Sequence, residues 1–85
     1  MNVTIDCSSI QTREDLHRVF SQALSFPAWY GNNLDALHDL LTTLKGTIRL
    51  ENWNTAEAAL GKYGIAAARA IAAAGLENTD LDIIL

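Results

Sequence analysis

The chain has 85 residues, of which 49% are hydrophobic, so it is long enough to form one domain with a modest core. Six Lys and Arg against ten Asp and Glu give a formal net charge of -4. This balance disfavours binding to nucleic acid, because affinity for a phosphate backbone comes mainly from basic side chains. Composition therefore predicts a single domain over residues 1–85 whose acidic surface suits a basic partner.

The cysteine content and the amino terminus predict a cytoplasmic protein. Cys7 is the only cysteine, so no internal disulfide can form. The first residues, "MNVTIDCSSI", lack both a basic region and a continuous apolar segment, and no run approaches the roughly 18 apolar residues of a membrane helix. We expect a soluble protein without membrane contact, in which Cys7 is buried as a small hydrophobic residue.

The N-terminal third predicts a strand followed by a helix. Apolar and polar residues alternate over residues 3–7, which indicates a strand. Thr12 is well placed to cap a helix in which apolar residues recur at helical spacing as far as Leu24. Pro27 closes this helix, since a proline disfavours the helical backbone of the residue before it, and residues 27–33 are expected to form a loop.

A second helix follows, capped by Asn33 and ended by Lys45 and Gly46. Its leucines fall within one narrow arc of the helix: Leu37, Leu40, Leu41 and Leu44. The opposite arc carries polar residues: Asp35, His38, Asp39 and Thr42. We expect the leucines to face a core and the polar arc to face solvent.

Two more helices are predicted in the C-terminal half. Asn54, with a glutamate three residues later, resembles a capping box that starts a third helix. Gly61 and Gly64 are expected to interrupt this helix. A fourth helix is then expected over residues 65–74, with Gly75 as its C-cap.

Two further strands flank these helices, "TIRLEN" over residues 47–52 and "DLDIIL" over residues 80–85. The second ends in a continuous apolar run, which is typical of a strand covered on both faces. Strands joined by crossovers of more than about 12 residues pair in parallel. The predicted fold class is therefore α/β, a small three-stranded parallel sheet with about four helices packed on it.

The segment "FPAWYGNNLDALHDLL", residues 26–41, carries the strongest functional signal. Asp35 and Asp39 are helical neighbours, and no Lys or Arg within the helix relieves their mutual repulsion. Trp29 and Tyr30 precede them in the loop, and aromatic side chains beside unpaired charge are typical of a protein interface. We expect at least one of the two rings to be exposed, although one of them could instead fill the core.

Catalytic and metal-binding interpretations have little support. A glycosidase places its carboxylates on either side of a sugar, whereas Asp35 and Asp39 lie side by side on one helix. His38 and His17 lie on different helices without a metal-ligand spacing, so both are expected to be ordinary surface imidazoles. No nucleophile motif is present. We therefore expect no enzyme activity, no metal and no cofactor.

The sequence "GKYG" at residues 61–64 offers one alternative function. It matches the G-x-x-G loop by which KH domains hold a nucleic-acid backbone. The pattern is short, the chain is acidic, and Lys62 is the only basic residue in the loop. A plain turn between two helices accounts for the same residues, and RNA binding stays an alternative.

The segment over residues 26–41 resembles the signature of the barstar family, intracellular inhibitors of extracellular microbial ribonucleases such as barnase. The order of predicted elements fits that family from "VTID" through "RLENW" to "DIIL". The resemblance implies a three-stranded parallel sheet with four helices and no catalysis. It also implies a one-to-one complex that covers the active site of a basic ribonuclease, and a chain that is a monomer when free.

The resemblance further implies an inhibitory surface on the loop and the second helix. Its residues are Trp29, Tyr30, Gly31, Asn33, Leu34, Asp35, His38, Asp39, Thr42 and Leu44. In the family, the carboxylate at the Asp39 position enters the phosphate-binding site of the enzyme, and the one at Asp35 meets neighbouring basic groups. The implied function is inhibition by an acidic helix face that imitates substrate phosphate. A domain of the same fold that binds another basic protein is the alternative.

The chain departs from the family pattern at several of these positions. Trp29 stands where a tyrosine is expected, and His38 and Leu44 stand where tryptophans are expected. An acidic contact late in the fourth helix falls near Ala73. These differences leave the identity of the ribonuclease open. His38 lies three residues after Asp35, and two roles are open for it: its protonation shields the acidic face, or its ring packs on the rim in place of the family's tryptophan.

Overall fold

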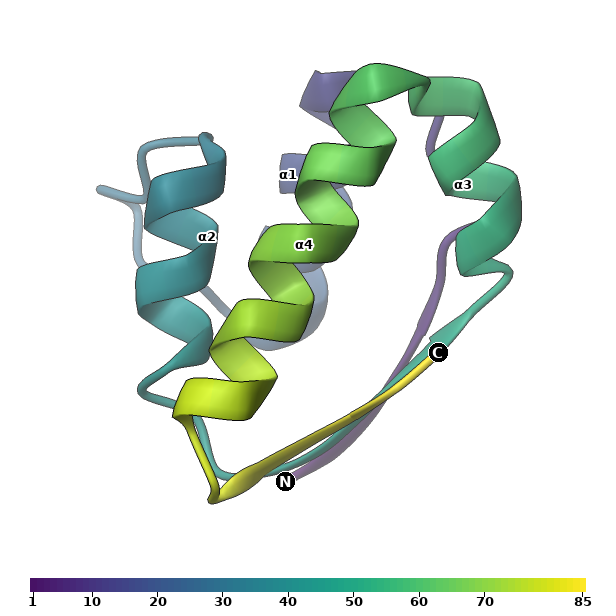
Figure 1. Cartoon of the computed structure of the whole chain (residues 1–85). Helices are drawn as coiled ribbons and strands as arrows, with labels where there is room; N and C mark the ends of the chain where they lie inside the picture. Colours follow the sequence, from purple (N-terminus) through teal and green to yellow (C-terminus); the bar gives the residue numbers. More distant parts are fainter.

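The computed structural model describes residues 1–85, which form a three-stranded sheet and four helices (Figure 1). The sheet order is β1-β2-β3, and both neighbouring pairs are parallel, so the predicted fold class is confirmed. None of the helices is long and apolar enough to cross a membrane. In chain order the elements are β1 (Asn2–Asp6), α1 (Arg13–Leu24), α2 (Leu34–Leu41), β2 (Gly46–Glu51), α3 (Trp53–Leu60), α4 (Lys62–Glu77) and β3 (Leu81–Ile84).

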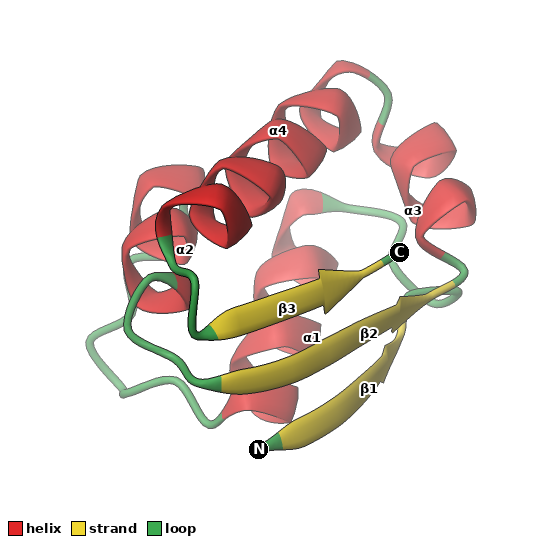
Figure 2. Cartoon of the chain, turned by 60° about the horizontal axis from the view of Figure 1, so that its bottom comes forward, coloured by secondary structure: helices red, strands yellow, loops and turns green.

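The helices cover one face of the sheet and leave the other face open (Figure 2). Ile48 and Leu50 of β2 point to the helices and are buried, whereas Arg49 between them is exposed. On β3, Leu81 is buried and Ile84 is 39% exposed. The prediction that the last strand is covered on both faces is therefore wrong. An apolar strand end without a second helical layer remains partly in solvent, at the edge of the sheet.

The core lies between the sheet and the four helices. The side chains that α1, α2 and β2 contribute to its most deeply buried part are at most 1% exposed: Leu16, Phe20, Leu37, Leu41 and Ile48. From α4 the small side chains of Ala67 and Ala74 are fully buried, which lets this helix approach its neighbours closely. Cys7 is also fully buried, as predicted, and desolvation raises the pKa of its thiol to about 11.

The N-caps predicted for the first two helices are confirmed. Thr12 accepts a hydrogen bond from the backbone N–H of Asp15 at 3.1 Å, and the Asp15 carboxylate accepts one from the Thr12 N–H at 3.2 Å. Asn33 accepts a hydrogen bond from the Ala36 N–H at 2.8 Å. Each contact spans three residues, so the sequence alone is sufficient to predict where α1 and α2 begin.

The end of α2 differs from the prediction. The helix stops at Leu41 instead of Lys45, and Leu44 lies in the turn before β2. The side-chain amide of Asn78, just after α4, donates to the carbonyl oxygens of Leu41 at 3.1 Å and Leu44 at 2.7 Å. These bonds hold the segment between α2 and β2 against the end of α4, and they come from a residue far along the chain.

The start of α3 also differs from the prediction. The helix begins at Trp53, and Asn52 before it has a left-handed backbone and makes no side-chain capping bond. The Glu57 carboxylate accepts a hydrogen bond from the Trp53 indole at 3.2 Å. The expected capping box of Asn54 and Glu57 is therefore wrong, because Asn54 already lies inside the helix and Glu57 is engaged by the indole.

The helix α4 is longer at both ends than predicted. Gly61 alone separates it from α3, while Gly64 and Gly75 lie inside the helix, which ends at Glu77. A Cβ atom on Gly64 would be only 2.8 Å from the Glu57 Cα, so glycine here allows α3 and α4 to pack closely. The "GKYG" sequence is thus a helix junction and the first turn of α4, which removes the open loop that a KH-like clamp requires.

Candidate partner-binding site

The polar arc of α2 lies on the surface, as predicted. Asp35 and Asp39 are exposed, and His38 and Thr42 are partly exposed. No Lys or Arg lies within ion-pair distance of either aspartate. This part of α2 therefore presents negative charge to solvent without a Lys or Arg of the same chain to neutralise it.

His38 connects this arc to the end of α4. Its Nδ1 lies 3.3 Å from the Asp39 carboxylate, and its Nε2 contacts the carboxylate of Glu77, the last residue of α4. The hydrogen bond to Asp39, and then the bond and charge of Glu77, raise the pKa of His38 above its ordinary value. The sequence predicts an ordinary surface imidazole at this position. In the structure, His38 instead contacts two carboxylates.

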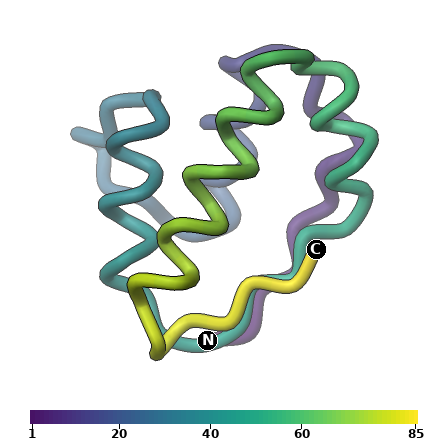
Figure 3. Tube along the Cα trace, viewed as in Figure 1, coloured from purple at the N-terminus to yellow at the C-terminus, as the bar shows by residue number.

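Glu77 adds a third carboxylate to the acidic side of the molecule. Figure 3 shows how the C-terminal ends of α2 and α4 come together, which brings Glu77 within contact of His38. Glu77 has no local signal in the sequence that links it to this arc, because 39 residues separate it from His38. The late acidic position was expected near Ala73, one helical turn earlier.

The two aromatic residues of the loop have opposite environments. Trp29 is 76% exposed, so the prediction of at least one exposed ring is confirmed. Tyr30 is 6% exposed and packs with its ring centroid 4.8 Å from that of Phe26. The loop thus presents Trp29 outward while Tyr30 anchors it to the core.

His17 lies beneath this loop and is 2% exposed. Its Nδ1 is 2.6 Å from the Tyr30 hydroxyl, and its Nε2 is 2.7 Å from the Tyr63 hydroxyl. Burial lowers the pKa of His17, so the ring is neutral near pH 7 and donates through one nitrogen while it accepts through the other. The expectation of a surface imidazole is wrong, because two tyrosines from distant segments supply buried partners.

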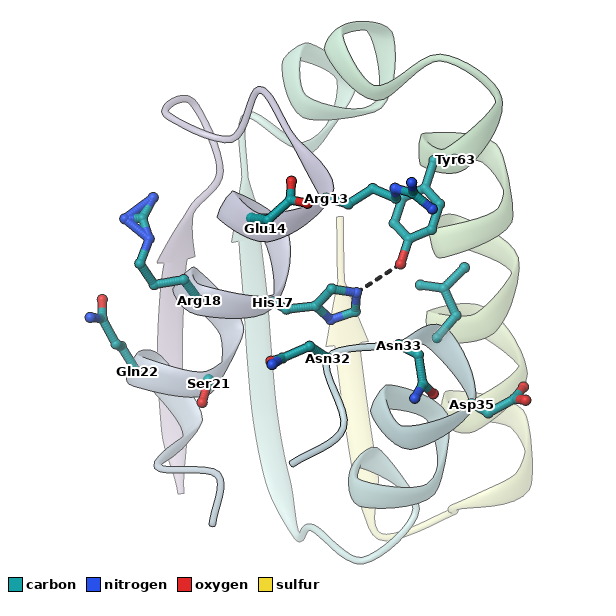
Figure 4. A pocket seen from close by; sticks show the side chains of 11 residues that line it. Arg13, Glu14, His17, Arg18, Ser21, Gln22, Asn32, Asn33, Asp35 and Tyr63 are labelled. Atoms are coloured by element: carbon teal, nitrogen blue, oxygen red, sulfur yellow. Dashed lines mark hydrogen bonds between the residues drawn. The ribbon is translucent and has the colours of Figure 1, made fainter. Parts of the chain in front are cut away.

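A groove of about 870 Å³ opens between α1 and the start of α2 (Figure 4). One wall is formed by polar residues of α1, the other by residues 32–35, and Tyr63 closes one end. Arg13 lies across the Tyr63 ring, with its guanidinium carbon 5.2 Å from the ring centroid. The structure contains no group of three His, Cys, Asp or Glu side chains arranged to hold a metal ion.

Comparison with known proteins identifies the family. A family model described as "Barstar (barnase inhibitor)" matches residues 1–83. The chain belongs to the barstar family. A protein of Bacillus subtilis (strain 168), named "Putative ribonuclease inhibitor YrdF", is 39% identical over 64 residues, which cover 72% of this chain and 70% of that protein. The resemblance inferred from residues 26–41 is confirmed, and the family supports a role of the barnase-inhibitor kind in general.

In this barstar-family chain, the residues predicted for the inhibitory surface do not all face solvent. Those that are exposed are Trp29, Gly31, Asn33, Asp35 and Asp39. Those that are partly exposed are Leu34, His38, Thr42 and Leu44. Tyr30 is buried, and it bonds to His17 instead of facing a partner.

Proposed function

We propose that this barstar-family chain is a non-catalytic, cytoplasmic inhibitor of a secreted microbial ribonuclease of the barnase type. The observation that carries the proposal is the exposed pair of Asp35 and Asp39 on α2, which no Lys or Arg of the chain neutralises. A ribonuclease must hold the phosphates of RNA in a cationic site. A rigid helix that presents carboxylates at a matching spacing competes for that site.

The contacts divide between charge and shape. Asp39 enters the phosphate-binding site, Asp35 pairs with neighbouring basic groups, and Trp29 packs on the rim of the enzyme as a large anchor. Tyr30 is buried and does not contact the enzyme. Its hydrogen bond to His17 fixes the loop that carries Trp29. The remaining surface residues complete the contact around these anchors: Gly31, Asn33, Leu34, His38, Thr42 and Leu44. The free chain is a monomer and the complex is one-to-one.

Inhibition of RNA hydrolysis tests this function. The purified chain is titrated into barnase and into a set of other small secreted bacterial ribonucleases, with cleavage of a fluorogenic RNA as the readout. We expect activity of at least one enzyme to fall linearly and to vanish at a one-to-one ratio. Full activity of every enzyme at micromolar concentrations of the chain would contradict the proposal. If no enzyme is inhibited and the chain instead binds a basic protein that is not a ribonuclease in a parallel titration, the alternative interaction domain is favoured.

A further inference from the structure

The groove beside α1 borders the proposed ribonuclease-binding surface. Asn33, Leu34 and Asp35 line the groove and also belong to that surface, and Figure 4 shows Asn33 and Asp35 on the α2 side of its opening. An enzyme that covers these three residues therefore reaches the mouth of the groove from the α2 side. A volume of about 870 Å³ is large enough to admit a side chain of the enzyme.

Arg13 is a fixed cation at this groove. Its guanidinium lies 5.2 Å from the ring centroid of Tyr63, and the Tyr63 hydroxyl is itself held 2.7 Å from the buried His17. No carboxylate lies within ion-pair distance of Arg13, whereas Arg18, on the same wall, is 2.7 Å from Asp15. The ring stacking thus positions the Arg13 charge without neutralising it.

Complex formation changes the environment of this cation. When a partner covers the groove, Arg13 loses water, and an unpaired buried charge is strongly unfavourable unless the partner supplies an acceptor. A carboxylate fits best, because the planar guanidinium can donate two parallel hydrogen bonds to it. Two carboxylates of this chain, Glu14 and Asp35, also line the groove, but neither forms an ion pair with Arg13. In the proposed complex, Asp35 pairs with basic groups of the enzyme.

We propose that the groove receives an acidic side chain of the inhibited ribonuclease, which pairs with Arg13. This inference rests on the proposed function and extends it: the interface has two signs of charge, acidic along α2 and cationic at the end of the groove. Arg13 is then a specificity determinant. It selects, among ribonucleases with similar basic active sites, those that carry a carboxylate beside that site.

The test exploits a difference in sign. An acidic inhibitor that loses any positive charge is attracted more strongly to a basic enzyme, so general attraction predicts unchanged or tighter binding for Arg13→Gln. Arg49→Gln makes the same charge change on the open face of the sheet and serves as the matched control. Dissociation constants and rates are measured with the ribonuclease that the wild-type chain inhibits, and thermal midpoints verify that each variant is folded.

We expect Arg13→Gln to weaken binding by about tenfold, through faster dissociation, and Arg49→Gln to leave it unchanged or slightly tighter. Arg13→Glu should weaken binding further, and Arg13→Lys should restore part of the loss. If Arg13→Gln binds as tightly as Arg49→Gln, or more tightly, this inference is wrong while the proposed function stands. If the wild-type chain inhibits no ribonuclease, the proposed function is contradicted and the inference falls with it.

Discussion

Asp39 lies in the second turn of α2, where the helix dipole stabilises a carboxylate little and where Asp35, one turn earlier, repels it. The contact between its carboxylate and His38 is 3.3 Å long. The charge of Asp39 therefore has one favourable contact in the free chain, with His38, and solvent screens this contact because the Asp39 side chain is 82% exposed. Its position is explained better by a contact with a cationic partner than by the stability of the fold.

The first prediction concerns Asp39→Ala. We expect the variant to fold as stably as the wild-type chain and to bind the ribonuclease more weakly by about thirtyfold or more, because the basic groups of the enzyme would be buried without their counter-charge. Calorimetric titration and thermal unfolding measure the two effects. Asp82→Ala, which removes an exposed carboxylate from the open face of the sheet, is the control. Equal affinity of both variants would contradict the role of Asp39.

The second prediction concerns His38. The carboxylates of Asp39 and Glu77 raise its pKa, so the ring takes up a proton at a higher pH than an ordinary histidine with a pKa of 6.5. Protonation stabilises the free chain below that ordinary value, and this contribution is lost as the pH rises through the raised pKa. The same proton partly neutralises the acidic face.

Affinity for the ribonuclease should therefore fall as the pH is lowered from about 7.5 to about 5.5, and His38→Gln should flatten this fall. Binding of both proteins to the same enzyme is measured across the range, so that titration of the enzyme affects both curves equally. Parallel curves for wild type and variant would show that His38 contributes by packing alone.

Among the elements, the loop over residues 27–33 depends most on tertiary contacts. Its Tyr30 reaches His17 on α1, and His17 reaches Tyr63 in the first turn of α4. One neutral imidazole thus holds together three segments. If the ring became charged, both nitrogens would donate, and one of the two tyrosine hydroxyls would lose the acceptor that the neutral ring provides.

The third prediction follows from this network. Because burial lowers the pKa of His17 below 6.5, the unfolded chain takes up a proton first as the pH falls. This contribution to stability is complete above pH 6.5 and is lost below it. Urea unfolding of His38→Gln, which lacks the opposing effect of His38, should show stability decreasing between about pH 7 and pH 5. A flat profile would show that His17 stays hydrated or charged in the fold.

The substitution Tyr63→Phe tests the same network by removing one of the two hydrogen-bond partners of His17. Loss of the hydroxyl leaves one nitrogen of the buried His17 without a partner, and we expect a loss of about 1 kcal/mol or more in the free energy of unfolding at pH 7.

The fourth prediction compares two glycines of α4. A methyl group on Gly64 would overlap the backbone of Glu57, whereas one on Gly75 would lie 3.5 Å from the Ile83 Cδ1, an ordinary packing distance. Gly64→Ala should therefore destabilise the chain by roughly 1–3 kcal/mol or more, while Gly75→Ala should stabilise it by up to about 1 kcal/mol. Chemical denaturation measures both. A similar effect of the two substitutions would contradict the close packing of α3 on α4.

The limits of prediction at the scale of elements are set by the range of the contacts. The capped starts of α1 and α2 follow from residues three positions apart, and β1 follows from the alternation of apolar and polar residues, so the sequence predicts them. The end of α2 depends on Asn78. The helix α4 continues through Gly64 because a glycine at this position can pack against the backbone of Glu57. Neither contact has a local signal.

At the scale of the whole molecule, the four helices lie on one face of the sheet, and this arrangement assembles the candidate site from several elements. The family signature over residues 26–41 is sufficient to predict the loop and α2. It does not predict Glu77 of α4 or Arg13 of α1, because these residues reach the site only through the packing of α1 and α4 beside α2.

The central claim is that the acidic face of α2 occupies the phosphate-binding site of a ribonuclease. Competition tests it most directly: the apparent dissociation constant of the chain is measured with the inhibited ribonuclease at increasing concentrations of a mononucleotide that binds the active site. If the two compete, the apparent constant rises in proportion to the mononucleotide concentration, until the chain no longer binds. A dissociation constant that stays the same at saturating mononucleotide would place the chain elsewhere on the enzyme and would contradict the claim.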